Sequence, residues 1–446
     1  MSKTDSLISP AVISLEMQEK GKRLIPGLSQ LLSKRPDQFA PGIWPGFFEK
    51  AKGAQIWDLD GNQYLDMSIG GIGANILGYA DPDVDRAVKD AIDCGSSSSL
   101  LCPEDVELAE LLCELHPWAE QVRYTRTGGE AMAVAVRIAR ASTKRDKIAI
   151  CGYHGWHDWY LAANVGTENA LGEHLLPGLE PVGVPRALKG TTLPFRYNHF
   201  DELEEIFRNN GEEIAAVVME PLRSEQPQGD FLNKAADIAR KNGAVFVFDE
   251  ISSGFRMNSG GAHLLLGVDP DIAVFSKSIG NGYPMAAVIG RAKIMEASQT
   301  SFISSTNWTE RIGPTAAIAT ISKHRCNDVG SHLMKLGGMV QAGWEKSAKE
   351  HNLPVHISGI PPMGHFSFET DQPQVYKALF VQLMLERGIL ATTGFYAMYA
   401  HTIENVERYN RTVNEVFGIM ADLKQRDGIT VALKGKPATA GFKRLA

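Results

Sequence analysis

The sequence contains few cysteines, no long apolar run and no leader-like beginning. Five of its 446 residues are cysteines, and none forms a Cys-X-X-Cys pair. This argues against a disulfide framework and favours reduced thiols in a cytoplasmic protein. No stretch approaches the length of a membrane-spanning helix. The opening residues "MSKTDSLISPAVISLEMQEKGKR" lack the apolar centre and cleavage site of a signal peptide. We therefore expect no membrane partner.

The sequence also lacks any segment dominated by positive charge. It has 45 Lys and Arg residues against 52 Asp and Glu, for a formal net charge of -7. This argues against a nucleic-acid partner, because such proteins concentrate Lys and Arg on one surface. With 44% hydrophobic and 22% charged residues, the composition is that of a globular protein with one or two large cores.

Short apolar runs alternate with helical patterns through the middle of the chain. The runs are "QVRYT", "KIAIC", "IAAVVM", "AVFVF", "DIAVF" and "MAAVIG". Each is rich in β-branched or aromatic residues and is apolar on both faces. This pattern predicts a mainly parallel sheet covered by helices on both sides, which is an α/β fold. Helical spacing with acidic first turns appears in "DPDVDRAVKDAI" and "PEDVELAELLCEL".

The two ends of the chain have a different texture. Near the N-terminus, "AQIWDLDGNQYLDM" alternates apolar and polar residues around Asp60, Gly61 and Asn62, which predicts a hairpin. The C-terminal part returns to amphipathic helices. We predict a large α/β domain over residues 76–320 and a smaller α+β domain over residues 321–446. The segment 1–75 is predicted to complete the smaller domain.

Polar residues follow the predicted strands, one strand after another. They are Asp249 after "AVFVF", Glu220 after "IAAVVM", Ser276 and Lys277 after "DIAVF", Tyr153 and His154 after "KIAIC", and Arg126 to Gly129 after "QVRYT". Ligands of open parallel sheets bind at the carboxyl ends of the strands. The sequence therefore predicts a single ligand site that contains these residues.

Lys277 and Asp249 have the chemistry for a covalent cofactor. No acidic residue is close to Lys277 in sequence, and a desolvated lysine becomes a nucleophile that can form a Schiff base. Asp249 needs a cation to stay ionised after a buried strand, and a protonated ring nitrogen would provide one. The ordinary alternative for Asp249 is a helix cap or an ion pair with Arg256.

A phosphate cradle and an aromatic residue complete the set. The turn Thr127, Gly128 and Gly129 opens the helix "EAMAVAVRIARA" and presents unpaired N–H groups at the positive end of its dipole. Tyr153 can stack on a flat ring, although a loop aromatic more often simply packs. A lysine nucleophile, a buried carboxylate, an aromatic residue and a phosphate cradle together indicate pyridoxal 5'-phosphate.

These motifs resemble a known family. The stretches "VFVFDEISSGFR", "AVFSKSIGNGYPMAAVIG", "TGGEAMAVAVRIARA" and "GYHGWHD" resemble the class III aminotransferases, most closely the branch that contains glutamate-1-semialdehyde aminomutase. The resemblance runs from about Ala51 to Gly290 and more loosely through "LERGILATTGFYAMYAHT". It implies a fold-type I homodimer with active sites at the subunit interface.

The resemblance also implies a role for each site residue. Lys277 would form the Schiff base and later move the proton, while Asp249 would hold the pyridine nitrogen protonated. Tyr153 and Ile251 would cover the two faces of the cofactor ring. The Gly128 and Gly129 amides would bind the phosphate, together with Thr306 of the partner chain. Glu220 would support these residues without contacting the cofactor directly. Ser276 either contacts the site or packs.

The implied function is transfer of an amino group from an amino donor to a carbonyl acceptor by a ping-pong mechanism. Alternatives on the same scaffold are a 1,2-aminomutase, a racemase, a decarboxylase and a cofactor-binding protein without turnover. Tyr396 stands where the aminomutase has an acidic residue, which counts against that reaction. Ser252 replaces a Gln or Met found in many relatives, which removes a contact expected to the ring hydroxyl.

Substrate recognition is less defined by the sequence. The candidates for holding a substrate carboxylate are Arg126, Arg223 and Arg256, although arginines at strand ends more often form structural ion pairs. An aromatic-walled substrate pocket would draw on Trp156, Trp159 and Trp308.

Two further motifs suggest other ligands and are disfavoured. "GGIGANILG" does not have the spacing of a dinucleotide-binding turn. His154, His157 and Asp158 lie in one loop with no distant third cluster, so we predict no metal site.

Overall fold

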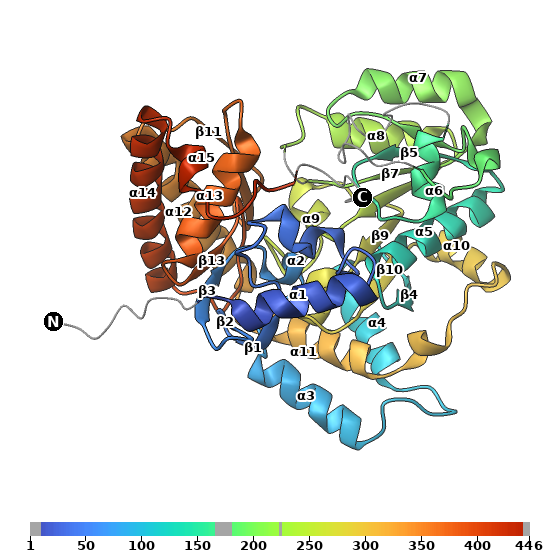
Figure 1. The fold of residues 1–446 in the computed structure, drawn as a ribbon. Helices are drawn as coiled ribbons and strands as arrows, with labels where there is room; N and C mark the ends of the chain where they lie inside the picture. The colour runs from blue at the N-terminus through green and yellow to red at the C-terminus, as the bar shows by residue number, and fades with distance from the viewer. Residues whose placement is uncertain (1–9, 166–180, 223–224, 440–446) are drawn as a thin grey trace. The chain divides into compact units, whose positions relative to one another are not determined.

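The computed structural model describes residues 10–165, 181–222 and 225–439 (Figure 1). The chain divides into two compact units. The sheet unit is Pro82–Gly330, and the terminal unit combines Met1–Asp81 with Ser331–Ala446. Each unit is described separately below.

The sheet unit contains a seven-stranded sheet in the order β4-β10-β9-β8-β7-β5-β6. Its strands are β4 (Gln121–Thr125), β5 (Lys147–Cys151), β6 (Thr192–Pro194), β7 (Ile214–Met219), β8 (Val245–Asp249), β9 (Ile272–Phe275) and β10 (Ala286–Gly290). Neighbours from β9 to β6 are parallel, and β10 is antiparallel to both β9 and β4. The predicted mainly parallel α/β sheet is confirmed, and each predicted apolar run forms one of its strands.

Both faces of this sheet are buried, which explains why its strands are apolar throughout. Successive side chains of a strand point to opposite faces. Val245 and Val247 of β8 pack in a core with α5 (Gly128–Thr143). Phe246 and Phe248 pack in a second core with α7 (Phe200–Asn210) and α8 (Phe231–Lys241).

The remaining helices of the sheet unit include two that the sequence predicted, α3 and α4. The set is α3 (Pro82–Asp93), α4 (Glu104–Leu115), α6 (Asp158–Leu161), α9 (His263–Leu266), α10 (Ala292–Met295) and α11 (Ile312–Cys326). The helix α11 packs against α3 and α4. Short 3-10 helices η6 (Lys277–Gly280) and η8 (Thr306–Thr309) lie in the loops that carry predicted site residues.

The terminal unit brings the two ends of the chain into one sheet. The hairpin of β2 (Gln55–Asp58) and β3 (Gln63–Met67) forms where the sequence predicts it. The Asp58 carboxylate closes its turn by accepting the N–H groups of Asp60 at 3.0 Å and Asn62 at 2.9 Å. The strand β13 (Ile389–Ala391) pairs parallel with β3, on the side away from β2. The strand β1 (Phe48–Lys52) pairs with β2 at the other edge of this sheet.

The other elements of the terminal unit are mostly helical. A second sheet has the order β11-β12-β14. The elements are β11 (Val355–Ser358), β12 (Met363–Phe368), β14 (Gly394–Tyr396), α1 (Val12–Leu24), α2 (Gly70–Gly73), α12 (Val329–Glu350), α13 (Pro373–Leu385), α14 (Ile403–Gln425) and α15 (Ile429–Ala432). Among the described residues, no helix has the length and apolarity needed to cross a lipid bilayer.

Candidate functional site

The sheet topology places the predicted site residues at one edge. Because β10 is antiparallel to both of its neighbours, β4 runs in the same direction as β9, β8, β7 and β5. The carboxyl ends of these strands therefore meet at the same edge of the sheet. The segments that follow them carry the predicted lysine, carboxylates, aromatic residue and glycine turn.

At the end of β8, the Asp249 carboxylate is buried and paired with a histidine. Asp249 is only 3% exposed, and its Oδ2 lies 2.8 Å from Nδ1 of the fully buried His154. Its Oδ1 accepts the N–H of Ile251 at 3.0 Å. His154 follows β5, so its side chain meets that of Asp249 beyond the end of β7, the strand between them.

The charge of Asp249 is only partly compensated within the chain. Burial raises the pKa of Asp249 because the carboxylate loses its hydration, while the hydrogen bonds from His154 and Ile251 act in the opposite direction. Nε2 of His154 is buried and has no hydrogen-bond partner among the described residues. A cation beside Asp249 would stabilise this arrangement, and the protonated ring nitrogen of a pyridine fits that requirement.

Glu220, at the end of β7, fixes the backbone beside Tyr153. Its Oε2 accepts the N–H of Tyr153 at 3.1 Å. A Cβ atom on Gly152 would lie 2.7 Å from the same oxygen, so the loop passes close to the carboxylate because Gly152 has no side chain. The Tyr153 ring packs edge-on against Tyr160, with ring centroids 5.9 Å apart. Glu220 therefore fixes the position of the Tyr153 backbone.

The glycine turn after β4 forms a closely packed N-terminus of α5. Thr127 caps the helix in a capping box with Glu130. A Cβ atom on Gly128 would lie 2.9 Å from Cδ1 of Ile251, and one on Gly129 would lie 2.9 Å from Cε1 of His157. The first amides of a helix have no partner within it and attract anions. The turn therefore fits a phosphate group.

Lys277 follows β9 and reaches a residue beyond β8. Its backbone is left-handed, with a φ of 49°, a conformation that residues other than glycine adopt at an energetic cost. Its Nζ donates a hydrogen bond to Oγ of Ser252 at 2.7 Å. The preceding Ser276 is buried, and its hydroxyl donates to the carbonyl of Met285 at 3.0 Å. The Ser276 hydroxyl therefore bonds to the backbone just before the start of β10.

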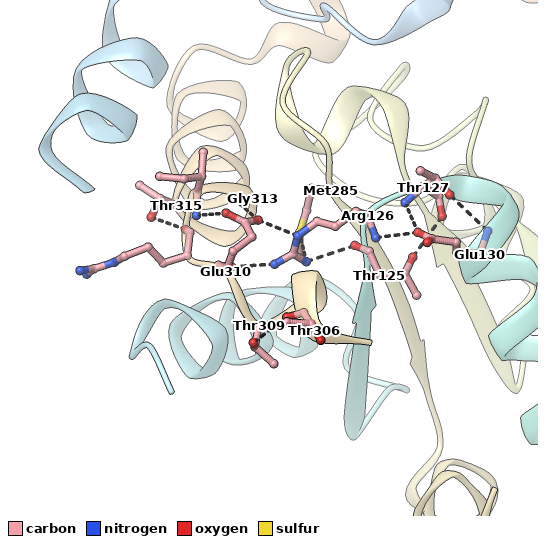
Figure 2. Close-up of polar contacts among 12 residues, drawn as sticks. Thr125, Arg126, Thr127, Glu130, Met285, Thr306, Thr309, Glu310, Gly313 and Thr315 are labelled. Carbon is pink, nitrogen blue, oxygen red and sulfur yellow. Dashed lines mark hydrogen bonds and ion pairs between the residues drawn. The ribbon is translucent and has the colours of Figure 1, made fainter. Parts of the chain in front are cut away.

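Arg126 forms an internal ion pair instead of presenting its charge to a ligand. Its Nε lies 2.6 Å from Oε1 of Glu310, and its Nη2 donates to the Glu310 carbonyl at 2.6 Å (Figure 2). Its Nη1 donates to the Thr125 carbonyl at 3.2 Å. Of the other candidate arginines, Arg256 is 1% exposed and its Nε donates to the Ser252 carbonyl at 3.1 Å. Arg223 lies outside the described residues.

Glu310 connects Arg126 to two further elements. Its carboxylate accepts the N–H groups of Ile312 at 2.6 Å and Gly313 at 3.0 Å, and so caps α11. It also follows η8, where the exposed Thr306 lies (Figure 2). One ion pair therefore links the glycine turn, the start of α11 and the segment that carries Thr306.

The histidines considered as metal ligands have other contacts. His154 pairs with Asp249, and the His157 ring stacks on Trp156 with centroids 4.4 Å apart. No group of three or more His, Cys, Asp or Glu side chains suited to a metal ion occurs in the described part of the chain. Of the tryptophans, Trp159 is buried against Tyr160, whereas Trp156 is 71% exposed.

The sequence alone does not reveal the contacts that His154, Ser252 and Glu310 make. It places His154 after a strand, at the edge predicted to hold the ligand, but it gives no sign that His154 contacts Asp249. The pairing with Asp249 depends on strand order, which no local pattern in the sequence specifies. Glu310 lies 184 residues from Arg126 along the chain, so no spacing rule connects them.

Comparison with known proteins identifies the family. The family described as Aminotransferase class-III matches residues 41–408. The chain belongs to the class III aminotransferases. It is 32% identical to the 3-aminobutyryl-CoA aminotransferase of Cloacimonas acidaminovorans, over 92% of this chain and 97% of that protein. It is 33% identical to the glutamate-1-semialdehyde 2,1-aminomutase of Anaeromyxobacter dehalogenans, over 89% of this chain and 95% of that protein.

Solved structures agree with this assignment. An omega-transaminase from Sphaerobacter thermophilus superposes with a TM-score of 0.79 at 27% identity, covering 91% of this chain and 97% of that one. The chain is thus a class III aminotransferase with the fold of type I pyridoxal-phosphate enzymes, as its sequence predicts. It is a pyridoxal-phosphate-dependent transaminase, and its substrates are small-molecule amino donors and carbonyl acceptors.

Proposed function

We propose that Lys277 is the residue to which pyridoxal phosphate attaches and that Asp249 faces its ring nitrogen. The supporting observation is their placement after adjacent parallel strands, β9 and β8, at the edge that also carries the glycine turn. Ile251 joins these parts, because it follows Asp249 and its side chain packs against Gly128. When bound, the cofactor supplies an electron sink for the carbon that carries the substrate's amino group.

Each residue around the cofactor would then have its own role. Asp249, held by His154, keeps a proton on the ring nitrogen, because a buried carboxylate stabilises the positive charge of the protonated nitrogen. Lys277 carries the proton to and from the substrate carbon through its Nζ. Tyr153 and Ile251 cover the two ring faces, with Glu220 fixing the backbone of Tyr153.

The amides of Gly128 and Gly129 would bind the phosphate, and a second copy of the chain would complete the site. Thr306 is exposed on η8, and the nearby Phe302 is 93% exposed. A hydroxyl and a large apolar side chain presented in this way support a homodimer in which Thr306 reaches the partner's phosphate. Arg126 is excluded from the proposed substrate contacts, because Glu310 already neutralises it.

Absorption spectroscopy with amino donors tests this function. The wild-type protein should show a visible band with pyridoxal phosphate, and an amino donor should convert that band. Borohydride should remove the band and leave the cofactor attached to Lys277 by a stable C–N bond. Lys277→Ala should lose the band, while the exposed control Lys293→Ala should keep it. A band that survives in Lys277→Ala would refute the assignment. Amino migration products from a diamino or amino-aldehyde compound would instead favour the aminomutase reaction.

We also propose that the enzyme works in the cytoplasm. All five cysteines lie in the described part of the chain, none is paired, and Cys94 and Cys326 are exposed. Unpaired exposed thiols persist in a reducing compartment. Mass spectrometry of alkylated thiols from intact cells would test this, because oxidised Cys94 or Cys326 would contradict the proposal.

A further inference from the structure

The amine of Lys277 has a specific hydroxyl partner. Nζ donates to Oγ of Ser252 at 2.7 Å, a good distance for a charge-assisted hydrogen bond. Ser252 lies just beyond Asp249 and Ile251, on the segment that links the ring-nitrogen carboxylate to the glycine turn. The hydroxyl therefore contacts the reacting nitrogen itself and lies within the proposed cofactor site.

The backbone around this hydroxyl is held from several sides. The Ser252 carbonyl accepts Nε of the buried Arg256 at 3.1 Å. The next hydroxyl, that of Ser253, donates to the buried Glu250 carboxylate. On the lysine side, Ser278 Oγ donates to the Gly254 carbonyl at 2.9 Å, which ties the two loops together.

We propose that Ser252 is a catalytic residue that holds the Lys277 amine beside the substrate carbon during proton transfer. This deepens the proposed function and rests on it. A hydroxyl oxygen can accept an N–H from either the ammonium or the neutral amine. As an acceptor, it leaves the lone pair of the neutral amine available for the proton.

The proposed step is balanced as a proton transfer. The Lys277 lone pair takes the proton from the substrate carbon, and the electron pair of the C–H bond stays with the carbon and the electron sink attached to it. Ser252 Oγ then accepts one of the three ammonium N–H groups, which stabilises a charge in a partly buried place. In the reverse direction Lys277 returns the proton and keeps its hydrogen bond to Ser252.

The test uses the full-length protein and three variants. Ser252→Ala removes the hydroxyl, Ser252→Thr retains one, and Ser142→Ala is a control that removes a hydroxyl near the end of α5, where it donates to the Ala139 carbonyl at 3.0 Å. The first measurement is the rate at which cofactor-free protein captures pyridoxal phosphate, followed by stopped-flow absorbance. The second is the exchange of the donor's carbon-bound hydrogen with deuterium from the solvent.

We expect Ser252→Ala to slow both rates about tenfold, the size of one lost hydrogen bond to a charged group. Ser252→Thr should restore most of each rate, and Ser142→Ala should change neither by more than about twofold. If Ser252→Ala leaves either rate unchanged, or Ser142→Ala slows them equally, the proposal is overturned. A wild-type protein that fails to capture the cofactor through Lys277 would instead overturn the proposed function.

Discussion

The ion pair between Arg126 and Glu310 gives a prediction that combines stability with cofactor binding. Arg126→Met retains an unbranched side chain of similar reach but removes the guanidinium. The Arg126 side chain is 10% exposed and that of Glu310 is 24% exposed, so Glu310 would become a largely buried carboxylate without its cation. The backbone N–H of Arg126, which donates to Glu130 at 3.2 Å, is unaffected.

The expected loss of stability depends on the hydrogen bonds that Glu310 retains in the variant. Breaking a buried pair by removing one partner costs roughly 3–5 kcal/mol. Glu310 retains the N–H groups of Ile312 and Gly313 and some contact with water, so we expect a loss of about 2–3 kcal/mol in the free energy of unfolding. Because the pair anchors the glycine turn to the segment after η8, bound pyridoxal phosphate should also dissociate faster.

A double-mutant cycle measures the interaction directly. Urea unfolding of Arg126→Met, Glu310→Gln and the double variant should give a coupling energy of about 1–2 kcal/mol. The double variant should be more stable than Arg126→Met alone, because it leaves no unpaired charge. A coupling energy near zero, or a double variant no better than Arg126→Met, would refute the view that this pair supports the turn.

Two other predictions follow from close packing and buried charge. Gly128→Ala should force Ile251 aside and weaken retention of pyridoxal phosphate at equilibrium dialysis. Gly338→Ala should not, because the added carbon would meet no described atom within 4 Å apart from the adjacent residues and the backbone of its own helix. Glu250→Gln should destabilise the chain at pH 7 and flatten the acid limb of its stability curve. Hydrogen bonds hold the pKa of Glu250 below 4.5, so its contribution is present above that value and disappears as pH falls through the lower, folded-state pKa. An unchanged slope in acid titration would contradict this.

The sequence predicts the strands of the sheet unit well because most of them are completely buried. Every residue of β7, β8, β9 and β10 is buried, and a fully buried strand must be apolar on both faces. The strand β6 was missed because it has only three residues, too few for a pattern. The gathering of these polar residues at one sheet edge was predictable for the same reason, since each of them follows or ends an apolar run.

Contacts between distant segments were not predictable in the same way. The pairs formed by His154 with Asp249, and by Lys277 with Ser252, depend on which strands are neighbours and on the path of the loops beyond them. Arg126 illustrates the limit most clearly. Its sequence position is compatible with a substrate contact or with a structural ion pair, and the sequence does not show that Glu310, just before α11, is its partner.

The consecutive carboxylates Asp249 and Glu250 differ in how completely the chain supports their negative charge. Both are buried, yet Glu250 is fully supported by the chain. Its carboxylate accepts a hydrogen bond from the backbone N–H of His263 at 2.9 Å and another from the hydroxyl of Ser253. The ring Nδ1 of His263 also lies 2.8 Å from this carboxylate. The tautomer is defined by Trp118, whose indole can only donate and lies 2.9 Å from Nε2 of His263, so the imidazole proton is on Nδ1.

At Glu250 the hydrogen-bond donors outweigh the effect of burial on the pKa, whereas the donors at Asp249 do not. Burial alone raises the pKa of a carboxylate, yet that of Glu250 is lowered, whereas that of Asp249 stays raised despite its histidine. The fold thus stabilises one buried negative charge by itself and leaves the adjacent one dependent on a further cation. A pyridinium bound beside Asp249 would supply that cation, and the binding energy would then favour the protonated ring that amino transfer requires.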